Sequence, residues 1–454
     1  MSAPHIAVVG GGLAGIAAAL ACGDAGARVT LLEARPRLGG ATFSTRREGL
    51  WIDNGQHVFL RCCSAYRGLL SRLGVADRVR LQERLAVPVL GPRGSIAWLR
   101  RSRLPAPLQL LPSLLRYRHL PRRERLRAGL AARALAALDP EDPALDAASL
   151  GSWLAARRQS PASIERFFDL VLRATLNLPA PEASLALAAL VFRTGVLGAG
   201  GAGDLGFARV PLQELHGEAA AGTLEAQGAR VWLRARAARI ELAADGRPVV
   251  RAGERSLACD AVVLAVPHDA AAALLPARAA LDPAALRGLG ASPIVNLHLL
   301  YDRRVLPFEL AAGVATPVQW IFDRSAAAGP LAPGQQLLAV SLSAAEPWVG
   351  RSTAELRQVF EPALAELLPE ARRARLLRFF ATCERAATFR QGPGTRRLRP
   401  GHETGLARVA LAGAWTDTGW PATMEGAVRS GLTAARAALL AAGTRRGLPQ
   451  VEAA

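Results

Sequence analysis

The sequence predicts an α/β fold with a discontinuous, Rossmann-like dinucleotide-binding domain. A second domain of mixed or antiparallel sheet, with an inserted helical region, is expected beside it. Three observations predict this class. An apolar strand enters a glycine-rich turn at the start of the chain, and buried strand patterns return at 260–267 and 409–412. Alternating segments between 293 and 400 are typical of antiparallel strands.

The first unit of this fold begins the chain. The apolar run His5–Val9 is typical of a buried parallel strand, and a helix over 13–25 follows it after a glycine-rich turn. We expect Gly10 to make the tight turn, Gly12 to let backbone N–H groups approach a pyrophosphate, and Gly15 to let the helix pack on the strand. The helix would direct its partly positive N-terminus at the phosphates.

An acidic residue completes the motif. Glu33 ends the second apolar strand, 18 residues after Gly15. This is close to the spacing of about 20 that is expected for the acid that binds a ribose hydroxyl. A carboxylate repels a 2′-phosphate, so NADP is disfavoured at this site. Strand, turn, helix and acid in register therefore predict a bound dinucleotide.

The composition is typical of a globular protein with a basic surface. The chain has 454 residues, of which 51% are hydrophobic and 20% charged, enough for two or three domains. The formal net charge is +19, and every basic residue is Arg because the sequence contains no Lys. Such a charge attracts anionic surfaces. We expect a membrane surface rather than nucleic acid, since no nucleic-acid-binding motif accompanies the charge.

The five cysteines predict neither a disulfide framework nor a metal site. Their number is odd, no CxxC pair occurs, and no His/Cys cluster has the spacing of metal ligands. A reduced cytoplasmic environment fits this pattern. The N-terminal apolar run belongs to the nucleotide strand rather than to a signal sequence, and no long uncharged apolar stretch predicts a membrane span.

The order of segments departs from that of an ordinary NAD dehydrogenase. Instead of a third βα repeat, the chain continues with the glycine pair Gly39-Gly40 and then with amphipathic helices from about 60 to 200, for example 124–138 and 163–176. The predicted domains are a dinucleotide-binding domain of 1–60, 205–275 and 401–443, a substrate and membrane-contact domain of 61–204 and 276–400, and a disordered tail over 444–454.

Residues 95–133 mix many arginines with many leucines, together with Trp98 and Tyr117. This composition suits an element that lies on anionic lipid, and it predicts peripheral contact at the inner face of the membrane. The alternative is a solvated helical pair that packs its leucines inward.

The C-terminal segment Leu411–Gly431 adds a strand, a loop and a helix that begins near 423. The amides at such a helix start can stabilise negative charge on a reduced flavin, and Gly426 and Gly431 allow close helix packing. Together with Gly10–Gly15, Glu33 and the glycine pair, this segment resembles the flavin amine oxidase and phytoene desaturase superfamily. The resemblance implies that FAD is the cofactor.

The resemblance further implies cofactor contacts at both ends of the chain and in the loop after the glycine pair. They are Gly10, Gly12, Leu13, Ala14, Gly15, Glu33, Ala34, Arg35, Gly39, Gly40, Ala41, Thr42, Gly55, Gln56, His57, Val231, Gly413, Ala414, Thr423 and Met424. Two of these depart from the family pattern. Ala414 stands where the superfamily usually has an acid for a ribityl hydroxyl, and Ala41 where amine oxidases often have Arg. Asp417 is a candidate substitute for the missing acid.

Three stretches resemble, within this superfamily, the squalene-associated hydroxysqualene dehydroxylases of hopanoid pathways. They are Asp53–His57, Val318–Arg324 and Trp415–Ala427. The resemblance implies reductive loss of the hydroxyl of hydroxysqualene to give squalene. It also implies a lipophilic isoprenoid substrate and upstream squalene-pathway enzymes as partners.

This reaction needs an acid near the hydroxyl, a long apolar tunnel and exclusion of water. We predict His57 or Asp417 as the acid, with Asp53 as a third candidate and structural hydrogen bonding as the alternative role. Trp320, Trp415 and Trp420 are predicted to line the substrate or flavin site, with plain core packing as their alternative.

Other functions stay open to different degrees. Amine oxidation is disfavoured because amine oxidases of this superfamily place a Lys near the flavin, and this chain has none. A polyisoprenoid desaturase of the phytoene type is the nearest alternative, because one tunnel and one flavin serve either direction of hydride transfer. GDP-dissociation inhibitors share the fold without flavin catalysis, but the intact nucleotide motif argues against that class.

Overall fold

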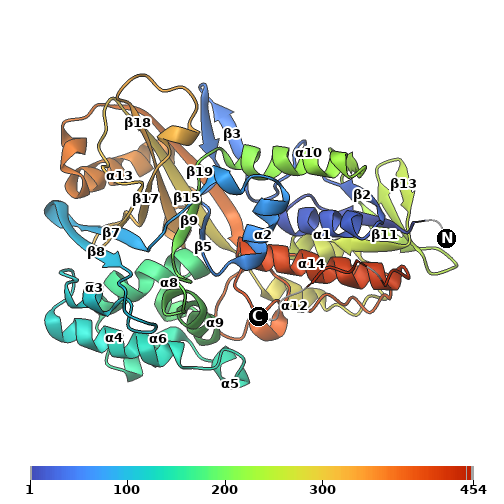
Figure 1. Cartoon of the computed structure of the whole chain (residues 1–454), viewed down its shortest axis with the longest axis horizontal. Helices are drawn as coiled ribbons and strands as arrows, with labels where there is room; N and C mark the ends of the chain where they lie inside the picture. The colour runs from blue at the N-terminus through green and yellow to red at the C-terminus, as the bar shows by residue number, and fades with distance from the viewer. Residues whose placement is uncertain (1–2, 446, 451–454) are drawn as a thin grey trace.

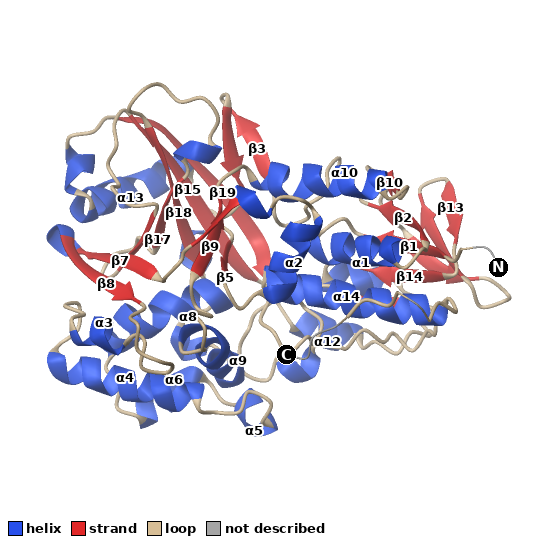
Figure 2. Ribbon diagram, in the orientation of Figure 1, coloured by secondary structure: helices blue, strands red, loops and turns tan. Residues whose placement is uncertain are grey.

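A five-stranded parallel sheet forms the nucleotide-binding lobe, on the right in Figures 1 and 2. The computed structural model describes residues 3–445 and 447–450. All neighbouring strands of this sheet are parallel, with the first strand of the chain at its centre. In spatial order they are β10 (Arg230–Trp232), β2 (Arg28–Leu32), β1 (His5–Val9), β14 (Ala261–Leu264) and β20 (Val409–Leu411). The predicted Rossmann-like α/β fold is confirmed.

The two faces of this sheet are covered differently. Buried residues of β1 alternate between the faces, because successive side chains of a strand point in opposite directions. One face packs against helices α1 (Leu13–Asp24), α2 (Ser64–Arg72), α10 (Ala219–Ala226) and α14 (Met424–Ala441). The other packs against an antiparallel meander, β11 (Arg239–Leu242), β12 (Pro248–Ala252) and β13 (Arg255–Ala258), and against α11 (His268–Leu274) and α12 (Pro283–Gly288).

Helices α1 and α14 approach each other closely. A Cβ on Gly431 would lie 2.1 Å from the carbonyl oxygen of Ala14, so only glycine fits there. The contact joins the first and last helices of the chain, which run side by side in Figure 1. Gly431 was expected to allow packing against a cofactor or the sheet, and it instead allows the close approach of α14 to helix α1.

A seven-stranded sheet forms the second lobe. In spatial order its strands are β19 (Leu376–Thr388), β15 (Ser292–Tyr301), β18 (Gln336–Ser343), β17 (Trp320–Asp323), β16 (Leu310–Gly313), β7 (Ala86–Gly91) and β8 (Ser95–Arg100). All neighbours are antiparallel except β16 and β7. One face packs against α13 (Thr353–Leu367), whose start is fixed by a capping box between Ser352 and Glu355. The other face lines the cavity described below.

Short helices cover the open edge of that cavity. They are α3 (Leu111–Leu115), α4 (Arg122–Ala136), α5 (Pro143–Asp146), α6 (Leu150–Ala156), α7 (Pro161–Ser163), η3 (Ile164–Phe168), α8 (Asp169–Leu176), α9 (Leu185–Leu190) and η5 (Val191–Val196). The predicted helices over 124–138 and 163–176 correspond to α4 and to η3 with α8. The prediction of continuous helices from about residue 60 is wrong for 79–100. Strands occupy that region because an apolar run turns back on itself at Pro92–Gly94.

Small strands connect the two lobes. The hairpin β3 (Ser44–Arg47) and β4 (Leu50–Asp53) follows β2. A three-stranded sheet has the order β5 (Val58–Leu60), β9 (Leu205–Ala208) and β6 (Val79–Leu81). The parallel sheet and these connections draw on distant segments, but the exact domain boundaries stay a prediction. Of the predicted disordered tail, 446 and 451–454 lie outside the described residues, and the described part forms no helix or strand.

Candidate active site

One large cavity of about 1270 Å³ runs between the two lobes. It begins at the glycine-rich turn after β1, where the carboxyl ends of the parallel strands meet, as is usual for ligands of open α/β sheets. It continues past the open face of the seven-stranded sheet and ends among the leucines of α3 and α4. The cavity therefore joins a nucleotide-type site to an apolar chamber.

The glycines of the first turn are required by close backbone contacts. Gly10 has a φ of +107°, and a Cβ there would lie 2.2 Å from the carbonyl oxygen of Ala265. A Cβ on Gly15 would lie 1.9 Å from the carbonyl oxygen of Gly10. Gly12 differs, since a Cβ there would project into the cavity and meet only Gly40 at 3.8 Å. Gly10 and Gly15 thus shape the turn, and Gly12 keeps the cavity open for a ligand.

Glu33 is held at the nucleotide end of the cavity by two backbone groups. Its Oε2 accepts the N–H of Gly11 at 2.7 Å, and its Oε1 accepts the N–H of Arg35 at the same distance. The side chain is buried but lines the cavity. Each carboxylate oxygen keeps acceptor capacity, as the ribose hydroxyls of a dinucleotide require.

The C-terminal loop is fixed by a buried guanidinium. Nη2 of Arg399 donates to the carbonyl oxygens of Thr416 at 2.5 Å and Trp420 at 2.9 Å. Burial lowers the pKa of Arg399 to about 10. Gln391 also holds this loop, because its Oε1 accepts the N–H of Ala422 at 2.8 Å. The loop that precedes α14 is therefore held against the cavity in one conformation.

Several buried polar groups of the cavity wall are available to form hydrogen bonds with a ligand. Gln56 Nε2, His57 Nε2 and Trp420 Nε1 are buried and have no hydrogen-bond partner among the described residues. Helix α14 begins at the wall with Thr423 as its N-cap, so its first amides face a site that suits a partly negative ring. With the glycine turn and Glu33, these groups fit a flavin dinucleotide.

Most of the predicted cofactor residues line this one cavity. They are Gly12, Leu13, Ala14, Glu33, Arg35, Gly39, Gly40, Ala41, Thr42, Gly55, Gln56, His57, Gly413, Ala414, Thr423 and Met424. Gly10 and Gly15 do not line the cavity, but they allow the close backbone contacts that form the turn. Ala34 and Val231 do not line the cavity, and Val231 lies on β10, the edge strand beside β2. The predicted contacts at Ala34 and Val231 therefore have no support from the geometry.

Asp417 lies away from the cavity, contrary to the expectation that its loop brings it to the flavin. Its Oδ1 accepts the N–H of Gly419 at 3.3 Å, and its Oδ2 lies 3.9 Å from Nε of Arg396. It lies on the outer side of the loop because the turn directs its carboxylate back to Gly419. We therefore assign it loop capping, and neither proton donation nor compensation for Ala414.

Asp53, the third candidate acid, is part of a buried ion pair. Its Oδ2 lies 2.7 Å from Nη2 of Arg324, and its Oδ1 accepts the hydroxyl of Ser44 at 2.6 Å. Arg324 also donates to the carbonyl oxygens of Ala208 and Val210. These contacts tie the hairpin β3–β4, the end of β17 and the chain after β9 together. The role of Asp53 is structural.

His57 lines the large cavity and also a small pocket that contains the Asp53–Arg324 ion pair. Burial lowers its pKa to about 4; Arg324 acts in the same direction, and Asp53 opposes it. The imidazole is therefore neutral at pH 7. His57 suits hydrogen bonding better than proton donation.

The far part of the cavity is apolar and aromatic. Trp320 and Phe322 of β17 stack with their ring centroids 6.3 Å apart, and Nε1 of Trp320 donates to the carbonyl oxygen of Leu170 at 3.2 Å. Phe167 and Phe192 line the opposite wall from the helices. Trp415 and Trp420 line the cavity at the C-terminal loop instead, with Trp415 Nε1 bonded to the carbonyl of Val266. The three predicted tryptophans thus all contact the cavity.

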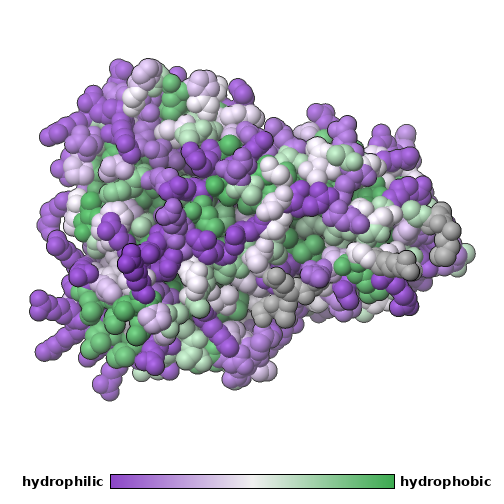
Figure 3. All heavy atoms as spheres, in the orientation of Figure 1, coloured by the Kyte–Doolittle hydropathy of each residue, from purple (hydrophilic) through white to green (hydrophobic). Residues whose placement is uncertain are grey.

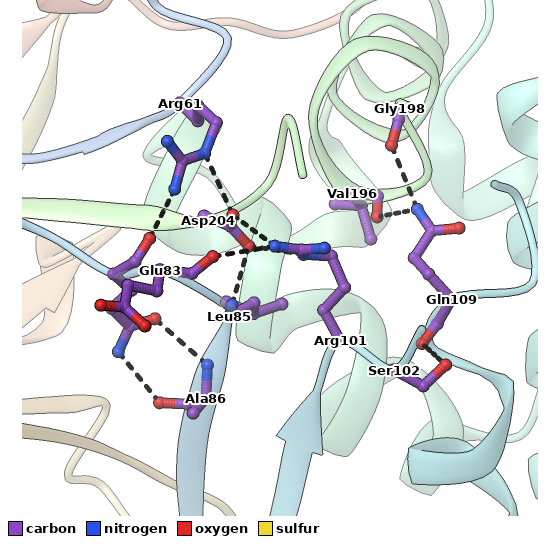
Figure 4. A network of polar contacts seen from close by, with 11 residues as sticks. Arg61, Glu83, Leu85, Ala86, Arg101, Ser102, Gln109, Val196, Gly198 and Asp204 are labelled. Atoms are coloured by element: carbon purple, nitrogen blue, oxygen red, sulfur yellow. Dashed lines mark hydrogen bonds and ion pairs between the residues drawn. The ribbon is translucent and has the colours of Figure 1, made fainter. Parts of the chain in front are cut away.

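The wall near the cavity mouth is held by a buried carboxylate (Figure 4). Asp204 accepts Nε of Arg101 at 2.8 Å, Nε of Arg61 at 3.1 Å and the N–H of Leu85 at 2.7 Å. Gln109 donates from the adjoining loop to the carbonyl oxygens of Val196 and Gly198. This network fixes the loop that leads from β8 to α3.

The mouth itself is surrounded by exposed leucines. Leu115, Leu126 and Leu130 are 56%, 59% and 60% exposed, and all three line the cavity. Figure 3 shows the resulting hydrophobic patch over α3 and α4, bordered by hydrophilic side chains. Its exposed arginines include Arg103, Arg116, Arg118, Arg122, Arg123, Arg127 and Arg133. The leucines of 95–133 are thus split. Leu99, Leu114 and Leu120 pack inward, whereas the exposed ones are Leu104, Leu108, Leu111, Leu115, Leu126 and Leu130.

Sequence reasoning missed three residues of this site. Glu384 lines the cavity from β19, and Arg399 and Gln391 hold the C-terminal loop. No alternation with apolar residues marks Glu384, which lies between Cys383 and Arg385 in its strand. No local sequence pattern marks Arg399 or Gln391, because their hydrogen-bond partners are backbone groups of distant segments. No cluster of metal-ligating side chains occurs among the described residues.

The fold and the cavity define a flavoprotein oxidoreductase. The family of flavin containing amine oxidoreductases matches residues 13–439, and the chain belongs to this family. Its cofactor is FAD. Among solved structures, a double mutant of putrescine oxidase has a TM-score of 0.70 at 20% identity and covers 96% of this chain and 99% of its own. Cyclohexylamine oxidase from Brevibacterium oxydans has a TM-score of 0.68 at 19% identity, with 97% and 99% covered.

Curated relatives belong to two isoprenoid enzyme groups. The hydroxysqualene dehydroxylase of Sinorhizobium fredii is 29% identical over 450 residues, with 96% of this chain and 98% of that protein covered. The 15-cis-phytoene desaturase of Solanum lycopersicum is 26% identical over 475 residues, with 95% of this chain and 77% of that protein covered. The comparisons therefore do not fix the substrate of this chain.

Proposed function

We propose that this protein reduces hydroxysqualene to squalene in an FAD-dependent reaction of hopanoid or triterpene precursor synthesis. The observation that carries the proposal is the single cavity that continues from the nucleotide motif into an aromatic, apolar chamber. The relatives add support, because the dehydroxylase of Sinorhizobium fredii matches over 98% of its length and the tomato desaturase over 77%.

The chain's own residues would bind and orient both molecules. Glu33 accepts hydrogen bonds from the ribose, the glycine turn and the start of α14 face the phosphates and the ring, and FAD when bound supplies two-electron hydride transfer. Trp320 and Phe322 provide the wall for a long hydrocarbon and keep water out, which would protect an allylic cation of the substrate from capture by water.

We also propose that the mouth of the cavity rests on the inner face of an anionic membrane. A polyisoprenoid is insoluble in water, and the exposed leucines of α3 and α4 give it an apolar path into the cavity. The arginines around them complement anionic headgroups. No helix among the described residues is long and apolar enough to cross a membrane, so the contact would be peripheral.

A phytoene-type desaturase is the second candidate, because the same apolar chamber accepts a long polyene and the relatives include such enzymes. The two reactions differ in the direction of hydride transfer. A desaturase oxidises its substrate and needs no proton donor for a leaving hydroxyl. The dehydroxylase needs a proton donor at the hydroxyl, whereas the desaturase needs a proton acceptor at the substrate, so a cavity-lining carboxylate fits either reaction.

The test is a pair of anaerobic incubations. Dithionite-reduced holoprotein is mixed with hydroxysqualene, and oxidised holoprotein is mixed with phytoene. The proposal predicts squalene and recovery of the flavin band near 450 nm (roughly, for oxidised flavin) in the first, and no change in the second. A flavin that stays reduced with hydroxysqualene contradicts the proposal, and bleaching by phytoene would establish the desaturase instead.

A further inference from the structure

The cavity is lined by four carboxylates among the described residues: Glu33, Asp269, Glu384 and Glu425. Three of them have other partners. Glu33 accepts two backbone N–H groups at the nucleotide end. Glu425 accepts the N–H groups of Ala65 and Tyr66 and pairs with Arg429 at 2.7 Å. Asp269 is exposed and accepts the N–H of the next residue at the start of α11.

Glu384 is the fourth carboxylate, and its surroundings are different. It lies on β19 directly opposite Ile294 of β15, and both residues line the cavity. Its Oε1 accepts Nδ2 of Asn54 at 3.3 Å, and its Oε2 has no hydrogen-bond partner among the described residues. The same Asn54 amide donates to the carbonyl oxygen of Ala41 at 2.8 Å. One carboxylate oxygen is therefore oriented by a fixed amide, and the carboxylate also interacts electrostatically with the guanidinium of Arg37.

The position of Glu384 along the cavity is also distinctive. Through Asn54 it adjoins both the glycine pair segment, which belongs to the nucleotide end, and the Gly55–His57 loop. Ile294 and Thr388 beside it lead toward the chamber walled by Trp320. Glu384 thus lies at the junction between the cofactor part and the hydrocarbon part.

We propose that Glu384 is the acid that protonates the departing hydroxyl of the substrate, an inference that rests on the proposed function. The carboxylic acid gives its proton to the hydroxyl oxygen, the carbon–oxygen bond breaks, and water leaves. The allylic carbon receives a hydride whose two electrons come from reduced flavin, which is thereby oxidised. The resulting carboxylate is reprotonated from solvent. His57 is the neighbouring alternative donor, because its Nε2 lines the same cavity and has no hydrogen-bond partner among the described residues.

Three variants test the assignment: Glu384→Gln, Glu384→Asp and the matched control Glu366→Gln, which changes an exposed carboxylate on α13 outside the cavity. Each is loaded with FAD, and its visible spectrum verifies the fold. In single anaerobic turnovers of hydroxysqualene, we expect Glu384→Gln to be slowed at least 100-fold. We expect Glu384→Asp to retain part of the rate and Glu366→Gln to match the parent protein. A Glu384→Gln protein as fast as its parent overturns the proposal.

A binding measurement separates this inference from the proposed function. In a hydroxysqualene analogue with an ammonium group in place of the hydroxyl, the positive charge would face Glu384. Titration of the oxidised protein needs no turnover. We expect Glu384→Gln to bind it about tenfold or more weakly than the parent, because a charge-assisted hydrogen bond is lost. If the parent makes no squalene, the proposed function fails, and this affinity still decides the role of Glu384. Weaker binding of the analogue by Glu384→Gln supports Glu384 as the group that faces the carbon bearing the hydroxyl. Equal affinities of the two proteins overturn this assignment.

Discussion

Asp53 and Arg324 form a buried ion pair with 2.7 Å between Oδ2 and Nη2, although they are 271 residues apart in sequence. Their side chains are only 6% and 9% exposed. The pair joins the hairpin before the cavity loop to the end of β17, which carries the aromatic wall. It therefore sets the spacing between His57 and Trp320 across the cavity.

Breaking this pair should be costly. Asp53→Asn leaves the guanidinium of Arg324 buried without its counter-charge, so we expect the free energy of unfolding to fall by about 3–5 kcal/mol. The double variant Asp53→Asn/Arg324→Gln should lose less than the sum of the two single losses. Urea unfolding of all four proteins measures this cycle. Single losses below about 1 kcal/mol, typical of exposed pairs, would contradict the structural role.

Substitution of Gly15 by Ala should disrupt the nucleotide end. A Cβ there would lie 1.9 Å from the carbonyl oxygen of Gly10, so helix α1 must move away from β1. We expect the purified protein to lose most of its FAD and to unfold at a lower temperature. Gly222→Ala on α10 is the matched control, because nothing lies within 4 Å of its Cβ. That change should stabilise the protein by about 0.5–1 kcal/mol. Equal FAD content in both variants would be evidence against this account of the turn.

Glu33→Gln should weaken FAD binding by about tenfold or more, because an acceptor with full negative charge is replaced by a neutral amide. The orientation of Gly11 and Arg35 is lost in part, since their N–H groups donate to the two Glu33 oxygens. Release of flavin fluorescence on dilution reports the Kd. The exposed Glu225→Gln on α10 should bind FAD like the parent. An unchanged Kd for Glu33→Gln would remove it from the ribose site.

The exposed mouth should control attachment to vesicles. We expect Leu126→Ser/Leu130→Ser to lower partitioning onto anionic phospholipid vesicles several-fold, because two leucines that are 59% and 60% exposed would no longer enter the interface. Leu440→Ser is the control, since Leu440 is 42% exposed on α14 in the other lobe. Sedimentation with vesicles measures the bound fraction. Equal losses for the two proteins would place the contact elsewhere.

Buried histidines should make the protein less stable in mild acid. Burial lowers the pKa of His298 to about 4, and unfolding returns it to about 6.5. Between these values the unfolded chain binds more protons, so the free energy of unfolding falls as the pH falls through this window. One histidine contributes up to about 1.4 kcal/mol per pH unit. His298→Asn should reduce the slope between pH 5 and 6 by about that amount. An identical slope would show that His298 is protonated in the folded state.

The nucleotide half of the fold could be predicted from the sequence because its signals are local. The strand before Gly10, the turn, helix α1 and Glu33 occur within 33 residues, and each has a periodicity or spacing that marks it. The family resemblance then located the C-terminal segment and the glycine pair. The strands β7 and β8 were missed although they form a local hairpin, and β7 alone also pairs with β16, which lies more than 200 residues later.

The candidate site was predicted in outline, and the identity of its acid stays a prediction. Asp417 belongs to a motif but turns outward, and Asp53 is neutralised by Arg324. Glu384 lies outside the motifs that carried the resemblance, and its place at the junction depends on the register of β19 against β15. Motifs identify which segments meet, whereas the direction of a side chain depends on packing between distant segments.

A single anaerobic turnover with counted products tests the central claim most directly. A known amount of reduced holoprotein is mixed with excess hydroxysqualene, and the squalene formed is compared with the flavin reoxidised. The account predicts one squalene for each flavin, with no squalene from the oxidised protein. Flavin that stays reduced while no squalene forms would contradict it.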